Sequence, residues 1–506
     1  MENRRENIGD LTAKNMFWNY IGKFAEFGLA GLFFLLVGRK LGPKGYGSYN
    51  LIMTFVTSLV LFLSIGFETA LVRFVPEYSA KGKDLEGYKL FKKLLVIRSG
   101  IFLLAALILL YFAGFIGSKL GEVEFVNLKY LISILLIGLG IRDIINAYYF
   151  SILNIKILSI IKIISQSAGL IVIAFLLYTM APRLEYAFYC FTFGIFVFVG
   201  ISLSRLKIIA EKYEFRSGEE NTSLKKIIKF SVFTWVTSVF TYFLGGQVNV
   251  LLLGYLLKDP EKIGYYSSAI MIGYLPGVFI SGMAGVFLPS LTRAMTSGGV
   301  DSFKKTLNGL SKVLIAVLVP VIVFLGAYPG RFITTLLGEK FFPSASLFRM
   351  YALFSLFNVL LLTHLTYNAL YALRQEKKVL YVRIISGVLN VCLLFILIPE
   401  FGPLGAVIAI SMSLFFQQVG EFFLIRRHVT GFYPSMLALK SVVASLVATG
   451  SVYYINLRGK IGLLVVCGVF VLVLIFLYKI LRVFSFEDKK RIANIHPMAE
   501  VISKIL

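Results

Sequence analysis

Long apolar segments separated by short polar segments follow one another along the whole chain. Each apolar segment has about 20 residues, which is enough for a helix to cross a bilayer. The pattern predicts an all-α polytopic membrane protein with fourteen transmembrane spans. Their expected limits are 15–38, 46–77, 92–116, 129–153, 160–180, 186–206, 230–256, 264–291, 311–328, 347–373, 380–398, 404–425, 437–456 and 461–481.

Composition and charge agree with a membrane protein. Of the 506 residues, 58% are hydrophobic and 15% are charged, whereas soluble domains are about 45–50% apolar and about 25% charged. A net charge of +25 on a soluble chain would suggest a nucleic-acid partner. Here most of the 51 Lys and Arg residues fall in cytoplasmic segments if the N-terminus is inside. We therefore expect both termini in the cytoplasm and no nucleic-acid partner.

The longest predicted cytoplasmic connection follows the sixth span and separates two related halves. The run GYGSY at 45–49 opens span two, and the similar run GYYSS at 264–268 opens span eight. Two six-span lobes in the same orientation form a parallel repeat, which places a substrate site between them. The predicted domains are the N-terminal lobe (1–210), the linker (211–229), the C-terminal lobe (230–428) and spans thirteen and fourteen with the tail (429–506).

A polar stripe on the first span ends in Lys23 and Glu26, which are three residues apart and able to pair. The second span adds Glu68 and Arg73. Ionisable groups at membrane depth usually line a cavity or a substrate path. The alternative is a buried ion pair that fixes helix packing, or, for Arg73, a long side chain that reaches the interface.

The centre of the fourth span carries Arg142, Asp143 and Asn146. Adjacent residues point about 100° apart on a helix, so Arg142 and Asp143 are not expected to face the same partner. One arrangement joins this group to the charged residues of spans one and two. Arg142 is the preferred anion-binding cation, because a guanidinium forks onto phosphate oxygens. Arg98 is expected to snorkel from span three to the membrane surface.

The second half carries milder polar groups. Asn249 lies on span seven, His364 on span ten, and Gln417, Gln418 and Glu421 on span twelve. Such groups often form hydrogen bonds between membrane helices. The sequence therefore predicts a cavity that is charged on the N-terminal lobe and less charged on the other lobe.

Several chemistries have no motif in this chain. It has no phosphate-binding P-loop and no HExxH or CxxC metal or redox motif. The three cysteines, Cys190, Cys392 and Cys467, all lie in apolar segments, so no disulfide framework follows. We expect neither an enzyme nor a bound cofactor, and a coupling ion, H⁺ or Na⁺, is left open.

The first two spans resemble the opening of the polysaccharide-transporter, or O-antigen flippase, family. That family belongs to the MOP superfamily of exporters, which also holds the multidrug MATE exporters and the lipid II flippases. In the usual family pattern span seven carries an Asp or Arg where this chain has Val248 and Asn249. The matching runs are NMFWNY at 15–20, GRKLGPKGYGSY at 38–49, GFETALVRF at 66–74, NVLLLG at 249–254 and GYY at 264–266.

The resemblance implies a two-lobed transporter of the cell membrane that works by alternating access. Its substrate would be an oligosaccharide linked through phosphate or pyrophosphate to a polyprenyl lipid, moved from the cytoplasmic to the outer leaflet. Membrane lipids and glycan-assembly enzymes would be its partners, and spans thirteen and fourteen would flank a groove for the lipid tail.

In that interpretation Lys23 and Arg142, helped by Arg73, attract the phosphate. Glu26 and Glu68 pair with these cations or take up the coupling ion. Two alternatives stay open at this point: a MATE-like cation or drug antiporter, and a non-transporting scaffold for glycan assembly.

Overall fold

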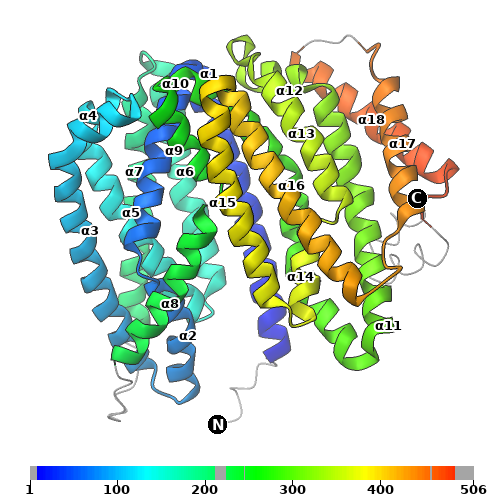
Figure 1. Cartoon of the computed structure of the whole chain (residues 1–506). Coiled ribbons are helices and arrows are strands. Elements are labelled where there is room, and N and C mark those ends of the chain that lie inside the picture. The colour runs from blue at the N-terminus through cyan, green and yellow to red at the C-terminus, as the bar shows by residue number, and fades with distance from the viewer. Residues whose placement is uncertain (1–7, 211–223, 244, 456–458, 485–506) are drawn as a thin grey trace. The chain divides into compact units, whose positions relative to one another are not determined.

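The computed structural model describes residues 8–210, 224–243, 245–455 and 459–484. Within these residues every regular element is a helix, which confirms the all-α prediction (Figure 1). Contacts divide the chain into an N-terminal unit, Met1–Gly264, and a C-terminal unit, Tyr265–Leu506. Most of the predicted linker 211–229 and the end of the predicted tail lie outside the described residues. The four predicted domain ranges stay a prediction.

The N-terminal unit contains nine helices among its described residues, and a tenth, α10, begins in it and continues into the C-terminal unit. Their bounds are α1 (Ile8–Leu63), α2 (Phe67–Ala80), α3 (Asp84–Leu120), α4 (Glu124–Asn127), α5 (Lys129–Ser151), α6 (Ile155–Thr179), α7 (Leu184–Ala210), α8 (Leu224–Tyr242), α9 (Gly246–Leu257) and α10 (Pro260–Gly273).

The C-terminal unit continues from α10 with eight further α-helices and a short 3₁₀ helix in the described residues. Their bounds are α11 (Leu275–Ala327), α12 (Pro329–Leu337), η1 (Glu339–Phe341), α13 (Ser344–Leu360), α14 (Leu365–Ala372), α15 (Glu376–Phe401), α16 (Pro403–His428), α17 (Ser435–Ser451) and α18 (Gly459–Ile480).

Ten described helices are long and apolar enough to cross a membrane, or eleven if the bent pair α8–α9 is one span. Two of the ten contain a break in the helical backbone. α1 changes direction at Gly42, whose φ of 71° an L side chain rarely adopts, and α11 does so at Gly298 and Gly299. The chain is thus a multi-pass membrane protein, while the count of fourteen spans and the side of the termini stay predictions.

Gly47 and Gly264, one from each of the two runs that suggest a repeat, lie close together in the N-terminal unit. A Cβ added to Gly47 would overlap the carbonyl oxygen of Pro260, and one added to Gly264 would overlap that of Pro43. Small residues let membrane helices approach closely. The glycines in these runs therefore have a packing reason, which the sequence pattern alone does not supply.

Outward-facing apolar side chains cover the long helix α3. Leu103, Leu104 and Leu107 are exposed, and Tyr111 is 84% exposed. A soluble protein rarely shows an apolar surface of this kind. These side chains are suited to contact with lipid.

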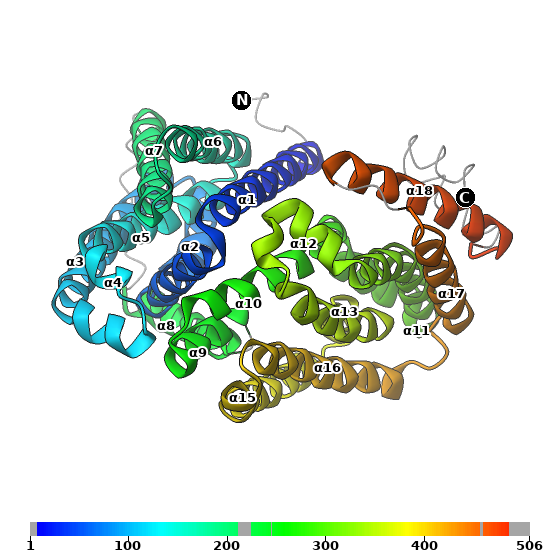
Figure 2. The ribbon, with the colours of Figure 1, turned by 90° about the horizontal axis from the view of Figure 1, so that it is seen from above.

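In the N-terminal unit α5 lies between two groups of helices. It packs against α2 and α3 on one side and against α1 and α7 on the other, and α6 packs along both α1 and α7 (Figure 2). The ring of Phe91 on α3 stacks on Tyr148 of α5 at 4.3 Å, within the buried core of this unit. α5 thereby holds its polar centre at a fixed position between the two groups.

In the C-terminal unit α11 forms extensive contacts with α13, α14 and α17, and α15 and α16 pack along each other. α17 and α18, which correspond to predicted spans thirteen and fourteen, pack against each other. Phe470 of α18 stacks on Phe324 of α11 at 4.1 Å, and the Tyr478 hydroxyl donates a hydrogen bond to the Ala316 carbonyl at 2.9 Å. These contacts attach the last two helices to the rest of this unit.

Candidate functional site

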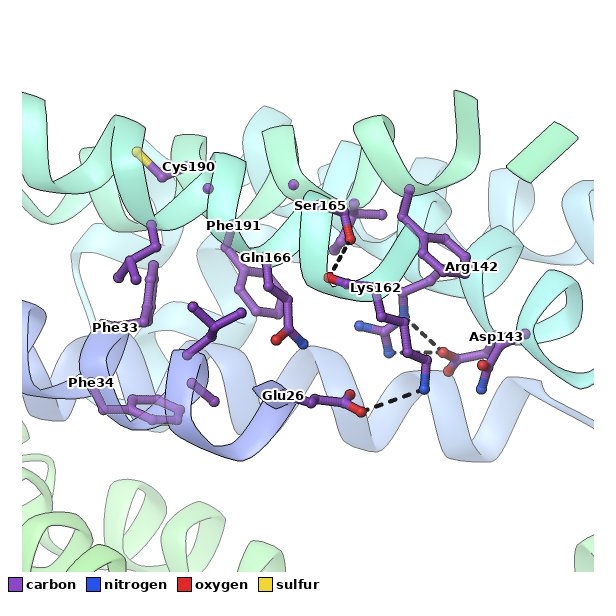
Figure 3. Close-up of a pocket in the computed structure, with 18 residues that line it drawn as sticks. Glu26, Phe33, Phe34, Arg142, Asp143, Lys162, Ser165, Gln166, Cys190 and Phe191 are labelled. Carbon is purple, nitrogen blue, oxygen red and sulfur yellow. Dashed lines mark hydrogen bonds and ion pairs between the residues drawn. The ribbon is translucent and has the colours of Figure 1, made fainter. Parts of the chain in front are cut away.

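Four helices of the N-terminal unit, α1, α5, α6 and α7, line a cavity of about 210 Å³, here called the first cavity (Figure 3). One end is charged, with Glu26, Arg142, Asp143 and Lys162. The other end is apolar. The first cavity could therefore hold an amphiphile, with its charged group at one end and its apolar group at the other. The lining of the apolar end includes Leu29, Ala30, Phe33, Phe34, Leu170, Cys190, Phe191 and Ile195.

Two ion pairs form the charged end. Lys162 on α6 lies with its Nζ 3.5 Å from Oε2 of Glu26 on α1. Arg142 donates from both Nε and Nη2 to Oδ1 of Asp143, at 2.9 and 2.8 Å. The side chains of Lys162 and Arg142 are 27% and 36% exposed. Partly exposed pairs are weak, about 1 kcal/mol or less, so a bound anion could replace either carboxylate.

A second cavity of about 440 Å³ lies on the other side of the same pair. Arg142 and Asp143 line it together with Glu68 from α2. Most of its other polar groups are hydroxyls and amides rather than charges. They are Thr57, Ser64, Thr69, Ser238 and Gln247.

The break between α1 and α2 forms one wall of the second cavity. Ile65 and Gly66 have positive φ, and the Ser64 carbonyl accepts a hydrogen bond from the backbone N–H of Phe67, the first residue of α2, at 3.2 Å. Arg98 of α3 donates to this carbonyl at 3.4 Å and to the Gly140 carbonyl at 2.7 Å. Its Nη2 lies 2.7 Å from Oε1 of Glu68.

Arg98 has 0% exposed side chain. The prediction that it snorkels to the surface is therefore wrong. The reason lies in the helix bounds, because α3 begins at Asp84 rather than at the predicted residue 92. Arg98 thus lies well inside the helix, where it holds Glu68 and the break between α1 and α2 in place.

The family model described as polysaccharide biosynthesis protein matches residues 12–295, more than half of the chain. The chain belongs to this family. The resemblance seen in spans one, two, seven and eight is thus confirmed, and its solved structural neighbours are members of the MOP superfamily.

Relatives at low identity share its length and fold. An uncharacterized membrane protein of Methanocaldococcus jannaschii is 22% identical over 98% of this chain and 99% of its own. The lipid II flippase MurJ, in an inward closed conformation, has a TM-score of 0.67 at 19% identity, covering 92% and 99% of the two chains. An inward-facing multidrug MATE transporter has a TM-score of 0.64 at 15% identity, covering 80% and 94%. This chain thus shares a fold with these transporters.

Five of the predicted site residues lie at the two cavities. Glu26, Arg142, Asp143 and Asn146 line the first cavity, and Glu68 lines the second. Arg142 and Asp143 bond to each other and face both cavities, so the expectation that they face different partners is wrong. Adjacent side chains leave a helix about 100° apart, but the long Arg142 side chain folds back far enough for its guanidinium to reach Asp143.

The other three predicted residues line neither cavity. Lys23 is exposed and forms no ion pair with another described residue, so the predicted pair with Glu26 is wrong. Arg73 is exposed, with its guanidinium 4.4 Å from the centre of the Phe230 ring. Asn249 is buried on α9.

Sequence reasoning missed Lys162 and Gln166, which both line the first cavity. Span five was expected to begin at residue 160, so Lys162 seemed to lie at the membrane surface. α6 in fact begins at Ile155, which puts Lys162 seven residues into the helix. The polar spacing of Lys162 and Gln166, one helical turn apart, is the signal that could have revealed them.

Proposed function

We propose that this membrane protein is a flippase. It moves an oligosaccharide linked through phosphate or pyrophosphate to a polyprenyl lipid across the cell membrane by alternating access, from the cytoplasmic to the outer leaflet. The observation that carries the proposal is the first cavity, which is charged at one end and apolar at the other. Such a cavity fits a member of the polysaccharide biosynthesis family, because a lipid-linked oligosaccharide substrate would be an amphiphile with a charged phosphate and an apolar chain.

The order of the linings matches the order of groups in this substrate. Phe33, Phe34 and Phe191 would contact the first isoprenyl units. Arg142 and Lys162 would hold the phosphate in the middle. The hydroxyl and amide groups of the second cavity would bind sugar hydroxyls, since a site built of such donors and acceptors recognises polar substrates.

Binding would proceed by exchange of carboxylate for phosphate. A guanidinium binds phosphate through two parallel hydrogen bonds. In this structure the Nε and Nη2 of Arg142 donate to Asp143 instead. Lys162 would act as a point charge beside it. Because both pairs are partly exposed, neither exchange leaves a buried carboxylate without solvent.

The same pairing weighs against a cation or drug antiporter. Such a site needs carboxylates that are free of competing cations. In the first cavity Glu26 and Asp143 each already face a cation, Lys162 and Arg142 respectively.

Reconstitution tests the proposal. Proteoliposomes holding a fluorescent polyprenyl-pyrophosphate oligosaccharide should show protein-dependent flipping. Arg142→Ala and Lys162→Ala should each slow it about tenfold or more, since a hydrogen bond to a charged group is worth about 1.5–3 kcal/mol. Lys89→Ala is the matched control, because Lys89 forms an exposed pair with Glu86 away from both cavities.

Three outcomes separate the alternatives. Full flipping by the Arg142→Ala, Lys162→Ala double variant removes the assignment of these residues. Export of cationic dyes without flipping of the lipid favours an antiporter. Absence of any protein-dependent flipping by the folded wild-type chain favours a scaffold.

A further inference from the structure

The C-terminal unit contains a second polar cluster, at a break in a membrane helix. α13 ends at Leu360 and α14 begins at Leu365. Between them Leu362 and His364 have φ values of 66° and 62°, which non-glycine residues rarely adopt. Neither glycine nor proline lies in this segment, and side-chain contacts add to the backbone hydrogen bonds that hold it, such as that from Thr363 to the Asn358 carbonyl at 2.9 Å.

Glutamine and threonine side chains supply those contacts. Nε2 of Gln418 donates to the Leu361 carbonyl and to the Thr366 hydroxyl, both at 2.8 Å. Thr366 in turn donates to Oε2 of Glu421 at 2.7 Å, and Gln417 donates to Oε1 at 3.1 Å. The break is thus tied through a chain of hydrogen bonds to one carboxyl group.

The Glu421 carboxyl group faces one cation, Arg383, which does not form a hydrogen bond to it. The Glu421 side chain is 1% exposed. The Nε of Arg383 lies 3.6 Å from its Oε1, beyond hydrogen-bond distance, and this Nε is buried without a hydrogen-bond partner. The Arg383 guanidinium lies over the Tyr367 ring at 4.7 Å, and its side chain is 25% exposed.

A carboxylate that is removed from water needs a cation, a metal or a proton. The place beside Oε1 is taken by Arg383, and the groups of Gln417, Gln418 and Thr366 that face this cluster act as N–H or O–H donors. A sodium ion would need oxygens there, as hard cations do. The exchangeable ion that fits this cluster is therefore a proton.

The ionisable groups around the carboxyl are few. Arg383 approaches from α15, and His364 and Tyr367 belong to the break and to α14, with their rings 6.4 Å apart. His364 is exposed, while Arg383 and Gln417 are half-buried and cover Glu421. We infer that Arg383 and Gln417 are the two side chains that must move before a proton can reach the carboxyl.

We propose that Glu421 is a proton-binding site that controls the break between α13 and α14. A proton from water adds to Glu421 Oε1, so the neutral acid no longer holds Arg383 and the Gln417 amide loses its charged acceptor. Loss of the proton restores the ion pair and the bonded break. That this switch is coupled to lipid flipping rests on the proposed function, whereas the proton site itself does not.

Carbodiimide labelling tests the site on the wild-type chain. Dicyclohexylcarbodiimide modifies protonated carboxyl groups in apolar surroundings, and mass spectrometry locates the product. In proteoliposomes without substrate, labelling of Glu421 should increase several-fold as the pH falls from about 8 to about 5. Arg383→Gln should increase it at every pH. Absence of labelling, or labelling that does not vary with pH, overturns the proposal.

Coupling is tested separately with Glu421→Gln, which keeps the shape and the hydrogen bonds but does not titrate. An inward-directed or outward-directed pH gradient should change the flipping rate of wild type and of the control Glu400→Gln, whose carboxyl is exposed at the end of α15. It should not change that of Glu421→Gln. If labelling succeeds but the variant still responds to the gradient, coupling at this site is excluded.

Discussion

The charged pairs at the first cavity, in the N-terminal unit, and the pair of Glu421 and Arg383, in the C-terminal unit, differ in their exposure. In the N-terminal unit Lys162 and Arg142 and their carboxylates are partly exposed to cavities. In the C-terminal unit Glu421 is fully buried and bonded to a helix break. Separating an exposed ion pair costs little free energy, so a ligand can replace one partner. Separating a buried pair costs more free energy, so protonation of the carboxylate is the easier way to break it.

The two cations nevertheless lie at the same distance from the start of their helices. Lys162 lies seven residues after the start of α6 at Ile155, and Arg383 lies seven residues after the start of α15 at Glu376. These helices correspond to predicted spans five and eleven, six spans apart. Each cation pairs with a carboxylate from another helix of its own unit. In the predicted repeat these two places correspond, and the two units use the cation there differently.

The largest effect is expected for the buried pair of the N-terminal unit. Arg98→Ala removes the donors to the Ser64 and Gly140 carbonyls as well as the partner of Glu68. We expect a loss of about 3–5 kcal/mol in stability, seen as a lower melting temperature in detergent and lower yield. Lys162→Ala should cost less than about 1 kcal/mol. Equal losses would contradict the distinction between buried and exposed pairs.

Arg142→Lys sharpens the role of the exposed pair. The lysine keeps the charge but loses the two-pronged hydrogen bond, so flipping should fall about tenfold while the melting temperature stays within the error of wild type. Flipping assays and thermal unfolding on one preparation check this. A variant as fast as wild type would show that charge alone suffices.

Smaller effects should separate the two cavities. Gln247→Leu, in the second cavity, should weaken binding of the sugar-bearing lipid about threefold to tenfold and leave binding of polyprenyl phosphate unchanged. Phe191→Ala, in the first cavity, should weaken binding of both lipids. A comparison of the two lipids by native mass spectrometry measures this. The reverse pattern would invert the proposed orientation of the substrate.

The smallest effect concerns a carboxyl outside the membrane spans. Burial raises the pKa of Glu122, in the turn after α3, above its ordinary value. Its stabilising contribution is therefore present at low pH and is lost as the pH rises through the folded-state pKa. Glu122→Gln should raise the melting temperature slightly at neutral pH and leave it unchanged in acid. A decrease at neutral pH would show that the ionised form is favoured.

The sequence predicts the helical fold and several of the charged residues that line the first cavity. Periodic apolar runs identify the membrane helices, and Glu26 and Arg142 are found because a charge at mid-span is hard to accommodate otherwise. Lys162 and Arg383 are missed for one reason. The apolar segments predicted at 160–180 and 380–398 begin later than the helices α6 and α15, so cations seven residues inside these helices seem to lie at the membrane surface.

The helix breaks could not be predicted from local pattern. Residues 361–364 contain neither glycine nor proline. Their conformation is stabilised by Gln418, which lies 57 residues after Leu361 in the chain and also bonds to Thr366. The partner of Glu68 was equally hidden, because Arg98 comes from another helix. Tertiary contacts decide both features.

Binding of a polyprenyl-pyrophosphate oligosaccharide to the detergent-solubilised chain tests the central claim most directly. Native mass spectrometry should show a one-to-one complex with wild type and with Lys89→Ala. The complex should be lost, at least about tenfold in affinity, with Arg142→Ala, while Glu421→Gln retains it. Undiminished binding by a folded Arg142→Ala, Lys162→Ala double variant would contradict the account.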